Sequence, residues 1–154
     1  MDRGKGGLKR STVVEAKGIP LGTVVAPANH HDSPLLERTL DTLEPLGELP
    51  DRASVHLDRA YDSAATREKL AARLLFGEIS QKGKSAPLRA GMRWVVERTN
   101  SWHNAHKKLV WCTERWGQVI DFWVAFSDVV IIVRKLIREA WIHSRWEGRP
   151  SRGP

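Results

Sequence analysis

The spacing of apolar and polar positions predicts a mixture of strands and helices. Two β-branched runs in STVVEAKGIPLGTVVAP flank the turn-like stretch KGIP, which predicts a two-stranded hairpin over residues 11–27. Ser33 followed by Pro34 is typical of a helix start, with a capping hydroxyl before a proline at the first helical position. The predicted helix carries an apolar stripe at helical spacing, made of Leu35, Leu36, Leu40 and Leu43.

Short strands and helices then alternate along the chain. SVHL at residues 54–57 predicts a short strand suited to a buried position, and LFGEIS at residues 75–80 predicts another. Between them, residues 64–75 alternate charged residues with Ala and Leu, as a surface helix does, and the chain reads as helical from Gly91 onward. This order of elements favours an α/β fold over an all-α one.

Composition and charge indicate an anionic partner. The 154 residues suffice for one domain, and 25 Lys and Arg against 18 Asp and Glu give a net charge of +7 and a pI near 10.0. Such a charge suggests nucleic acid ahead of a membrane surface, although simple solubility is an equally good explanation of charge alone. We expect a basic Gly-rich segment at residues 1–10, one domain at residues 11–143 and a basic flexible tail at residues 144–154.

Cysteine content and hydropathy restrict the setting. The single Cys112 excludes an internal disulfide, and the sequence shows no secretory signal, so we expect a reducing, cytoplasmic environment. The most apolar stretch, residues 119–137, is interrupted by charged residues and is too broken to span a membrane. One face of this predicted helix is apolar, and we expect it to lie in the core; its residues are Val119, Trp123, Phe126, Val130 and Ile137.

The first candidate site is Asp58, which directly follows the SVHL strand. In an open α/β sheet, ligands and chemistry lie beyond the carboxyl ends of strands, and Asp58 occupies such a position. The commoner role of an Asp here is to cap a turn or a helix, and Asp62 is predicted to be such a cap.

The second candidate site is a polar stripe within RWVVERTNSWHNAHKKL, residues 93–109. At 100° per residue, four polar side chains lie within about 40° of Glu97 around a continuous helix. A solvated helix face with one Arg–Glu pair, worth ~0.3 kcal/mol, is the simple alternative. Neighbouring Trp and Val residues predict a largely buried helix, however, and an acid there is better explained if a metal ion or phosphates approach it. The four residues are Arg93, Ser101, Asn104 and Lys108.

Four motifs together resemble a known family. DRGKGGLKRS, GIPL followed by ANHHDSP, LDRAYDS and RWVVERTNSW are similar, in that order, to the catalytic core of insertion-sequence transposases of the IS5 and IS4 type. The resemblance extends from Asp2 to about Arg149. It implies a ribonuclease-H-like fold, with a mixed sheet flanked by helices, a helical C-terminal part and a triad of acids.

The resemblance assigns roles to individual residues. Asp58 corresponds to the second acid of the triad, and Glu97 of the R-x-x-x-E element corresponds to the third. Both are then catalytic residues and ligands of Mg²⁺ or Mn²⁺, in metal-dependent DNA strand cleavage and strand transfer at insertion-sequence ends. Ala90 and Asn104 replace a Tyr and a Lys of the IS4 signature, which places the chain nearer the IS5 pattern. The implied DNA-contacting residues are Arg93, Asn104, Lys107 and Lys108, with element ends and target DNA as partners and self-association as a further possibility.

One part of the family pattern has no counterpart. The first acid belongs on a strand ahead of the DRGK segment, and this chain begins Met1-Asp2-Arg3. We therefore expect an N-terminally truncated transposase core that lacks its first strand and is inactive alone, either an element remnant or a start site placed too late. Two alternatives are a non-catalytic nucleic-acid-binding remnant and another ribonuclease-H-like nuclease.

Overall fold

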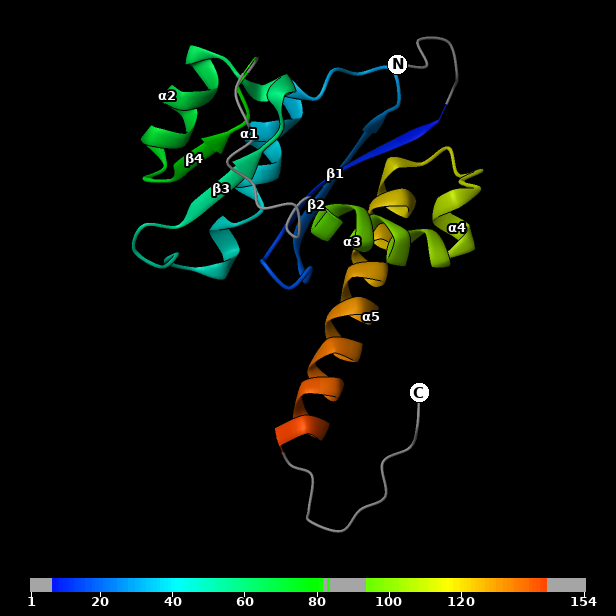
Figure 1. Ribbon diagram of the computed structural model, residues 1–154. Helices are drawn as coiled ribbons and strands as arrows, with labels where there is room; N and C mark the ends of the chain where they lie inside the picture. Colours follow the sequence, from blue (N-terminus) through cyan, green and yellow to red (C-terminus); the bar gives the residue numbers. More distant parts are fainter. Residues whose placement is uncertain (1–6, 82, 84–93, 144–154) are drawn as a thin grey trace.

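A long antiparallel hairpin lies at the centre of the structure (Figure 1). The computed structural model describes residues 7–81, 83 and 94–143. The hairpin consists of β1 (Leu8–Val14) and β2 (Pro20–Pro27), paired from Leu8 opposite Pro27 to Val14 opposite Pro20. This confirms the predicted hairpin. The hairpin begins three residues before the predicted residue 11, because residues 8–10 also pair with residues 25–27.

The turn of the hairpin is held by its own residues. The Glu15 carboxylate accepts hydrogen bonds from the backbone N–H groups of Lys17 (2.8 Å) and Ile19 (3.2 Å). Gly18 has φ +86°, in the left-handed region that glycine adopts without steric cost. A Cβ at Gly18 would also lie 3.3 Å from Oγ1 of Thr99, so the turn packs closely against a later helix.

A second, parallel sheet lies beside the hairpin. It pairs β3 (Ser54–Leu57) with β4 (Phe76–Ile79), and these strands are connected through a 3-10 turn (Arg59–Tyr61) and α2 (Ala64–Ala72). Both predicted strands are confirmed. The prediction that SVHL is buried is wrong, because its side chains alternate between exposed and half-buried, as in a strand with one solvated face.

Helix α1 (Ser33–Asp41) and the 3-10 turn Glu44–Leu46 connect the two sheets. The predicted leucine stripe is confirmed, because all four of its side chains are buried. Ser33 is not the cap, however: Asp32 takes the N-cap position and makes no side-chain capping bond. The core of this half contains Leu36, Leu40, Leu43, Leu70, Leu75 and Ile79, with Val13 of β1 and Val55 of β3 packed against it.

These elements confirm the predicted α/β fold. Among the described residues, however, the strands form two two-stranded sheets, β1-β2 and β3-β4, rather than one mixed sheet. The shared hydrophobic core holds the two sheets together, and no hydrogen bond joins them within the part of the chain that the structure describes.

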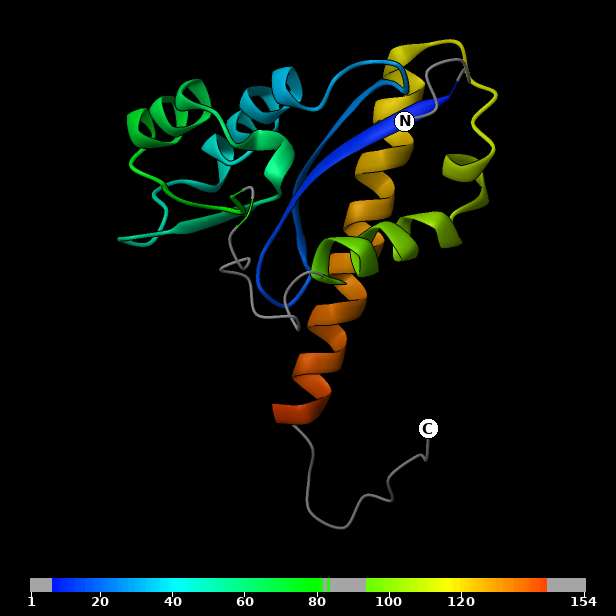
Figure 2. The same ribbon diagram turned by 45° about the horizontal axis from the view of Figure 1, so that its top comes forward.

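Three helices cover the other side of the hairpin. They are α3 (Trp94–Ala105), α4 (Lys107–Val110) and the long α5 (Gly117–His143). Helix α5 runs along β2, contacts α3 and α4, and continues past the hairpin turn (Figures 1 and 2). Within the described part of the chain, no helix is sufficiently long and apolar to cross a membrane.

The buried side of α5 differs from the sequence prediction. We expected Val119, Phe126 and Ile137 to face the core, but they are 36%, 46% and 52% exposed. The helix instead buries Val124, Ser127 and Ile131.

Candidate active site

Asp58 lies where the sequence predicts, immediately after β3. Its backbone is extended and it caps the 3-10 turn, with Oδ1 accepting a hydrogen bond from the backbone N–H of Ala60 at 2.9 Å. Asp58 therefore has the capping role that the sequence indicates as the commoner one. Among the described residues, the second carboxylate oxygen makes no hydrogen bond, which leaves Oδ2 available for a ligand. Asp62 does not cap α2, because Ser63 takes that position and accepts from the backbone N–H of Thr66.

Two residues near Asp58 were not predicted. Burial raises the pKa of Tyr61 to about 12, and the negative charges of Asp32 and then Asp58 act in the same direction. The carboxylates of Asp32 and Asp58 therefore both raise the pKa of the same phenol. Asp32 also forms an ion pair with Lys9 near the start of β1 at 2.8 Å, which ties the start of β1 to the start of α1. The sequence signal for Asp32 is its place in the HDSP motif, directly before Ser33 and Pro34.

Glu97 lies on the exposed side of α3. The fully buried residues of this helix are Thr99 and His103, and Glu97 precedes Thr99 by about 200° around the helix. The prediction of a largely buried helix is wrong. Trp94 and Val96 are 48% and 40% exposed, because α3 turns its small and polar residues inward against the Gly18 turn.

Buried polar contacts fix α3 in place. Thr99 donates a hydrogen bond to the Gly18 carbonyl oxygen at 2.7 Å. His103, which has no exposed surface, places Nε2 2.6 Å from Oδ1 of Asp128 on α5. Helix α3 also contacts β1. The hairpin and α5 together therefore fix the orientation of α3 about its axis, and with it the side on which Glu97 lies.

The predicted polar stripe does not continue along one helix to Lys108. Helix α3 ends at Ala105 and His106 is extended, so Lys107 and Lys108 begin a separate short helix. Asn104 Oδ1 accepts a hydrogen bond from Nη2 of Arg10 at 2.5 Å. Burial lowers the pKa of Arg10, an effect that the nearby Asp128 opposes.

The two lysines have local partners. The Lys107 ammonium lies 5.5 Å from the ring centroid of Trp111, and that of Lys108 lies 2.5 Å from Oε1 of Glu114. Arg93 lies outside the described residues, and so does its predicted pairing with Glu97.

No described contact joins Asp58 to Glu97, and the part of the chain that the structure describes holds no cluster of three or more His, Cys, Asp or Glu able to bind a metal ion. The two carboxylates are nevertheless of the donor type that Mg²⁺ and Mn²⁺ prefer, and Mg²⁺ takes only one or two protein carboxylates beside water and phosphate oxygens.

Comparison with known proteins identifies the family. The profile of the transposase DDE domain matches residues 1–117, a stretch that contains both acids and all four DNA-contacting candidates. The chain therefore belongs to the DDE-domain transposase family.

A curated relative narrows this family to insertion-sequence elements. A protein of Burkholderia cepacia, named as a transposase for insertion sequence element IS402, is 32% identical over 114 residues. The alignment covers 70% of this chain and 54% of the relative, so the chain spans about half of that protein. Both findings confirm the predicted resemblance to insertion-sequence transposases.

Proposed function

We propose that this chain supplies two of the three acids of a transposase active centre that cleaves DNA strands at insertion-sequence ends and joins them to target DNA. The position of Asp58 carries the proposal. It follows a parallel strand within the family-matched stretch and keeps one carboxylate oxygen free of protein partners among the described residues. Glu97 is proposed as the other acid, on a helix face that a DNA strand can reach.

A divalent ion fits the proposed chemistry. Members of this family depend on divalent metals, which promote in-line displacement at phosphorus by activating the attacking oxygen and stabilising the leaving one. We propose Asp58 and Glu97 as ligands of Mg²⁺ or Mn²⁺, completed by a third acid and by DNA phosphate oxygens. Around them, Arg93, Asn104, Lys107 and Lys108 are proposed to hold the DNA backbone.

The test compares acid substitutions in a protein that also carries the family's first acid. Asp58→Asn or Glu97→Gln should abolish nicking of supercoiled DNA carrying element ends, in Mg²⁺ and in Mn²⁺, while DNA binding stays within about twofold. Each change keeps the side-chain shape and removes one ligand charge. The matched control is Asp62→Asn, whose carboxylate pairs with Arg67 and should matter little to cleavage.

The 154-residue chain by itself should not nick DNA, because it offers two acids where the family uses three. Robust nicking by this chain that Asp58→Asn removes would contradict the proposed division of the triad. Full cleavage by the Asp58→Asn variant of the longer protein would contradict the site itself.

A non-catalytic nucleic-acid-binding role is the second candidate, and the net charge of +7 favours it. It predicts salt-sensitive binding without preference for element ends and without cleavage in any metal.

A further inference from the structure

Helix α5 carries an exposed apolar seam on the side that faces away from the hairpin. Its members recur at alternating intervals of three and four residues, which is the a/d spacing of a coiled coil. Each of the six side chains is between 36% and 60% exposed. They are Val119, Phe122, Phe126, Val129, Val133 and Leu136.

The seam is separate from the side of α5 that packs on the protein. Val124, Ser127 and Ile131 are buried, and Phe126 and Val133 lie about 140–180° around the helix from Val124 and Ile131. The seam carries no charged side chain, and the rings of Phe122 and Phe126 stack with centroids 6.1 Å apart. Six half-exposed side chains of this size leave on the order of 500 Å² of apolar surface in one stripe, near the upper end for a monomer.

We propose that this seam is the contact surface between two copies of the chain, paired as an antiparallel two-helix coiled coil through α5. The seam is self-complementary in this direction. A two-fold axis between Ser127 and Asp128 sets Val119 opposite Leu136, Phe122 opposite Val133 and Phe126 opposite Val129 of the other copy. Every a position then meets a d position, and each layer occurs twice.

Charge along α5 favours the antiparallel direction. Asp121 lies in the first half of the helix and Arg134 in the second half, at equal distances from the two-fold axis. The acids Asp128 and Glu139 are instead paired within the same chain, with His103 and Lys17. Antiparallel pairing brings each acidic half beside a basic half and opposes the two helix dipoles. Parallel pairing would bring the two basic halves together.

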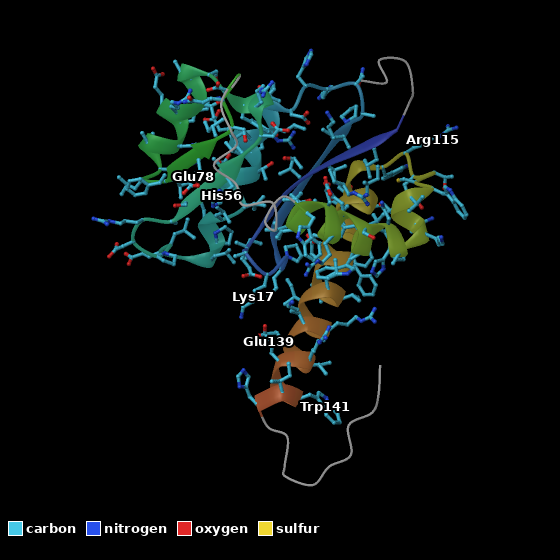
Figure 3. All side chains as sticks on the ribbon, in the orientation of Figure 1. Lys17, His56, Glu78, Arg115, Glu139 and Trp141 are labelled. Atoms are coloured by element: carbon cyan, nitrogen blue, oxygen red, sulfur yellow. The ribbon has the colours of Figure 1, made fainter. Side chains whose placement is uncertain are left out.

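The interaction of α5 with the hairpin leaves the seam free for a partner. Lys17 at the hairpin turn pairs with Glu139 at 3.6 Å, and Lys135 donates to the Lys17 carbonyl oxygen at 3.5 Å. These contacts attach the second half of the helix to the protein from the hairpin side (Figure 3). The seam is thus presented on a helix that is already fixed, which lowers the entropy cost of association.

The first experiment measures the mass of the full 154-residue chain by light scattering across a dilution series. We expect twice the 17.4 kDa chain mass, and a monomer for Phe126→Glu. The control is Leu46→Glu, which places the same charge on a 54% exposed leucine away from α5 and should stay dimeric. A monomeric wild-type chain, or a Phe126→Glu variant that remains dimeric, would overturn the proposal.

A rescue separates loss of the interface from loss of folding. Phe126→Glu combined with Val129→Lys brings the new carboxylate opposite the new ammonium of the other copy and should restore at least part of the dimer. Circular dichroism must show the same helix content for all variants. A double variant that is folded and fully monomeric would count against the proposed layers.

Cross-linking tests the direction in a Cys112→Ser background. When a Val119→Cys chain is mixed with a Leu136→Cys chain, antiparallel pairing should give mixed disulfides, because these positions face each other. In a parallel pair they would be about 25 Å apart along the axis. Disulfides only between identical variants would overturn the antiparallel arrangement. None of these results depends on DNA cleavage, so the proposal stands or fails independently of the proposed function.

Discussion

The pKa of Tyr61 is sensitive to the carboxylates of Asp32 and Asp58. Its pKa is raised to about 12 by burial, with Asp32 and Asp58 adding to the effect, against about 10 in an unfolded chain. Between these two pH values the unfolded state binds fewer protons, so the stabilisation by Tyr61 is complete below pH 10 and is lost as the pH rises towards 12. Urea midpoints should fall across this window, and fall less in Tyr61→Phe. An equal fall in both proteins would show that the phenol is not perturbed.

Asp128 is expected to be the most sensitive acid of α5. Its Oδ1 meets Nε2 of the fully buried His103, whose Nδ1 has no partner among the described residues. Asp128→Asn keeps an acceptor and should cost little. Asp128→Leu leaves the imidazole buried and unpaired, at a cost of about 1–3 kcal/mol in urea unfolding. Asp121→Leu, on the exposed side of the same helix, should change stability by less than about 0.5 kcal/mol. Equal losses at both positions would contradict the role of the His103 contact.

At the level of secondary-structure elements, Gly22 sets how closely β2 packs on α1. A Cβ at this position would lie 2.0 Å from Oγ1 and 2.4 Å from Cβ of Thr42, which ends α1. Neither atom is the far end of a flexible side chain, so Gly22→Ala must move the helix from the hairpin and should cost about 1–3 kcal/mol.

The matched control for this substitution is Gly117→Ala. It adds the same methyl group at the start of α5, where no atom of the described residues lies within 4 Å, and should be neutral or slightly stabilising in the same thermal or urea unfolding experiment. A neutral Gly22→Ala variant would mean that α1 and β2 are less tightly packed than in this structure.

The elements that the sequence predicts well are those with local signals. The hairpin has a turn between two β-branched runs, and α1 has a proline start and a leucine stripe that the core needs. The burial of α3 could not be predicted, because its two fully buried residues, Thr99 and His103, are polar and gain their partners from β1–β2 and α5. In α5, apolar residues surround much of the helix, so periodicity alone does not show which side faces the protein.

In the candidate site too, local sequence patterns predict some features, and contacts between distant elements decide the others. Asp58 follows from its place after a strand, which is a local pattern. Its neighbourhood with Asp32 and Tyr61 depends on how α1 and the 3-10 turn pack together, and no spacing in the sequence encodes that. The R-x-x-x-E motif identifies Glu97 as a candidate. Its exposure could not be predicted, because it depends on the buried contacts of Thr99 and His103 on the opposite side of α3.

Across the whole molecule, the hairpin separates two groups of elements with different roles. The side with β3, β4 and α2 carries Asp58, and the side with α3, α4 and α5 carries Glu97 and the candidate lysines (Figure 2). Over residues 7–81, 83 and 94–143 the two sheets share a hydrophobic core but no hydrogen bonds. The distance between the two acids therefore depends on how both groups pack on α1 and the hairpin. We propose that DNA and metal bind across this division and stabilise the arrangement in which both acids act.

The net charge of +7 attracts DNA to the whole surface, whereas Lys107 and Lys108 of α4 are proposed to contact the DNA backbone directly. Lys108→Ala should weaken binding to all DNA sequences and reduce the slope of log K against log salt by about one, as for one phosphate contact. Because Lys108 pairs with Glu114 at 2.5 Å, Glu114→Gln should have the opposite effect and strengthen binding. Lys69→Ala is the control: this lysine is paired with Glu37 at 2.8 Å on the α1–α2 side and should leave the slope unchanged. Fluorescence anisotropy at several salt concentrations measures all three variants. Equal slopes for Lys108→Ala and Lys69→Ala would show that α4 does not contact DNA and that the attraction comes only from overall charge.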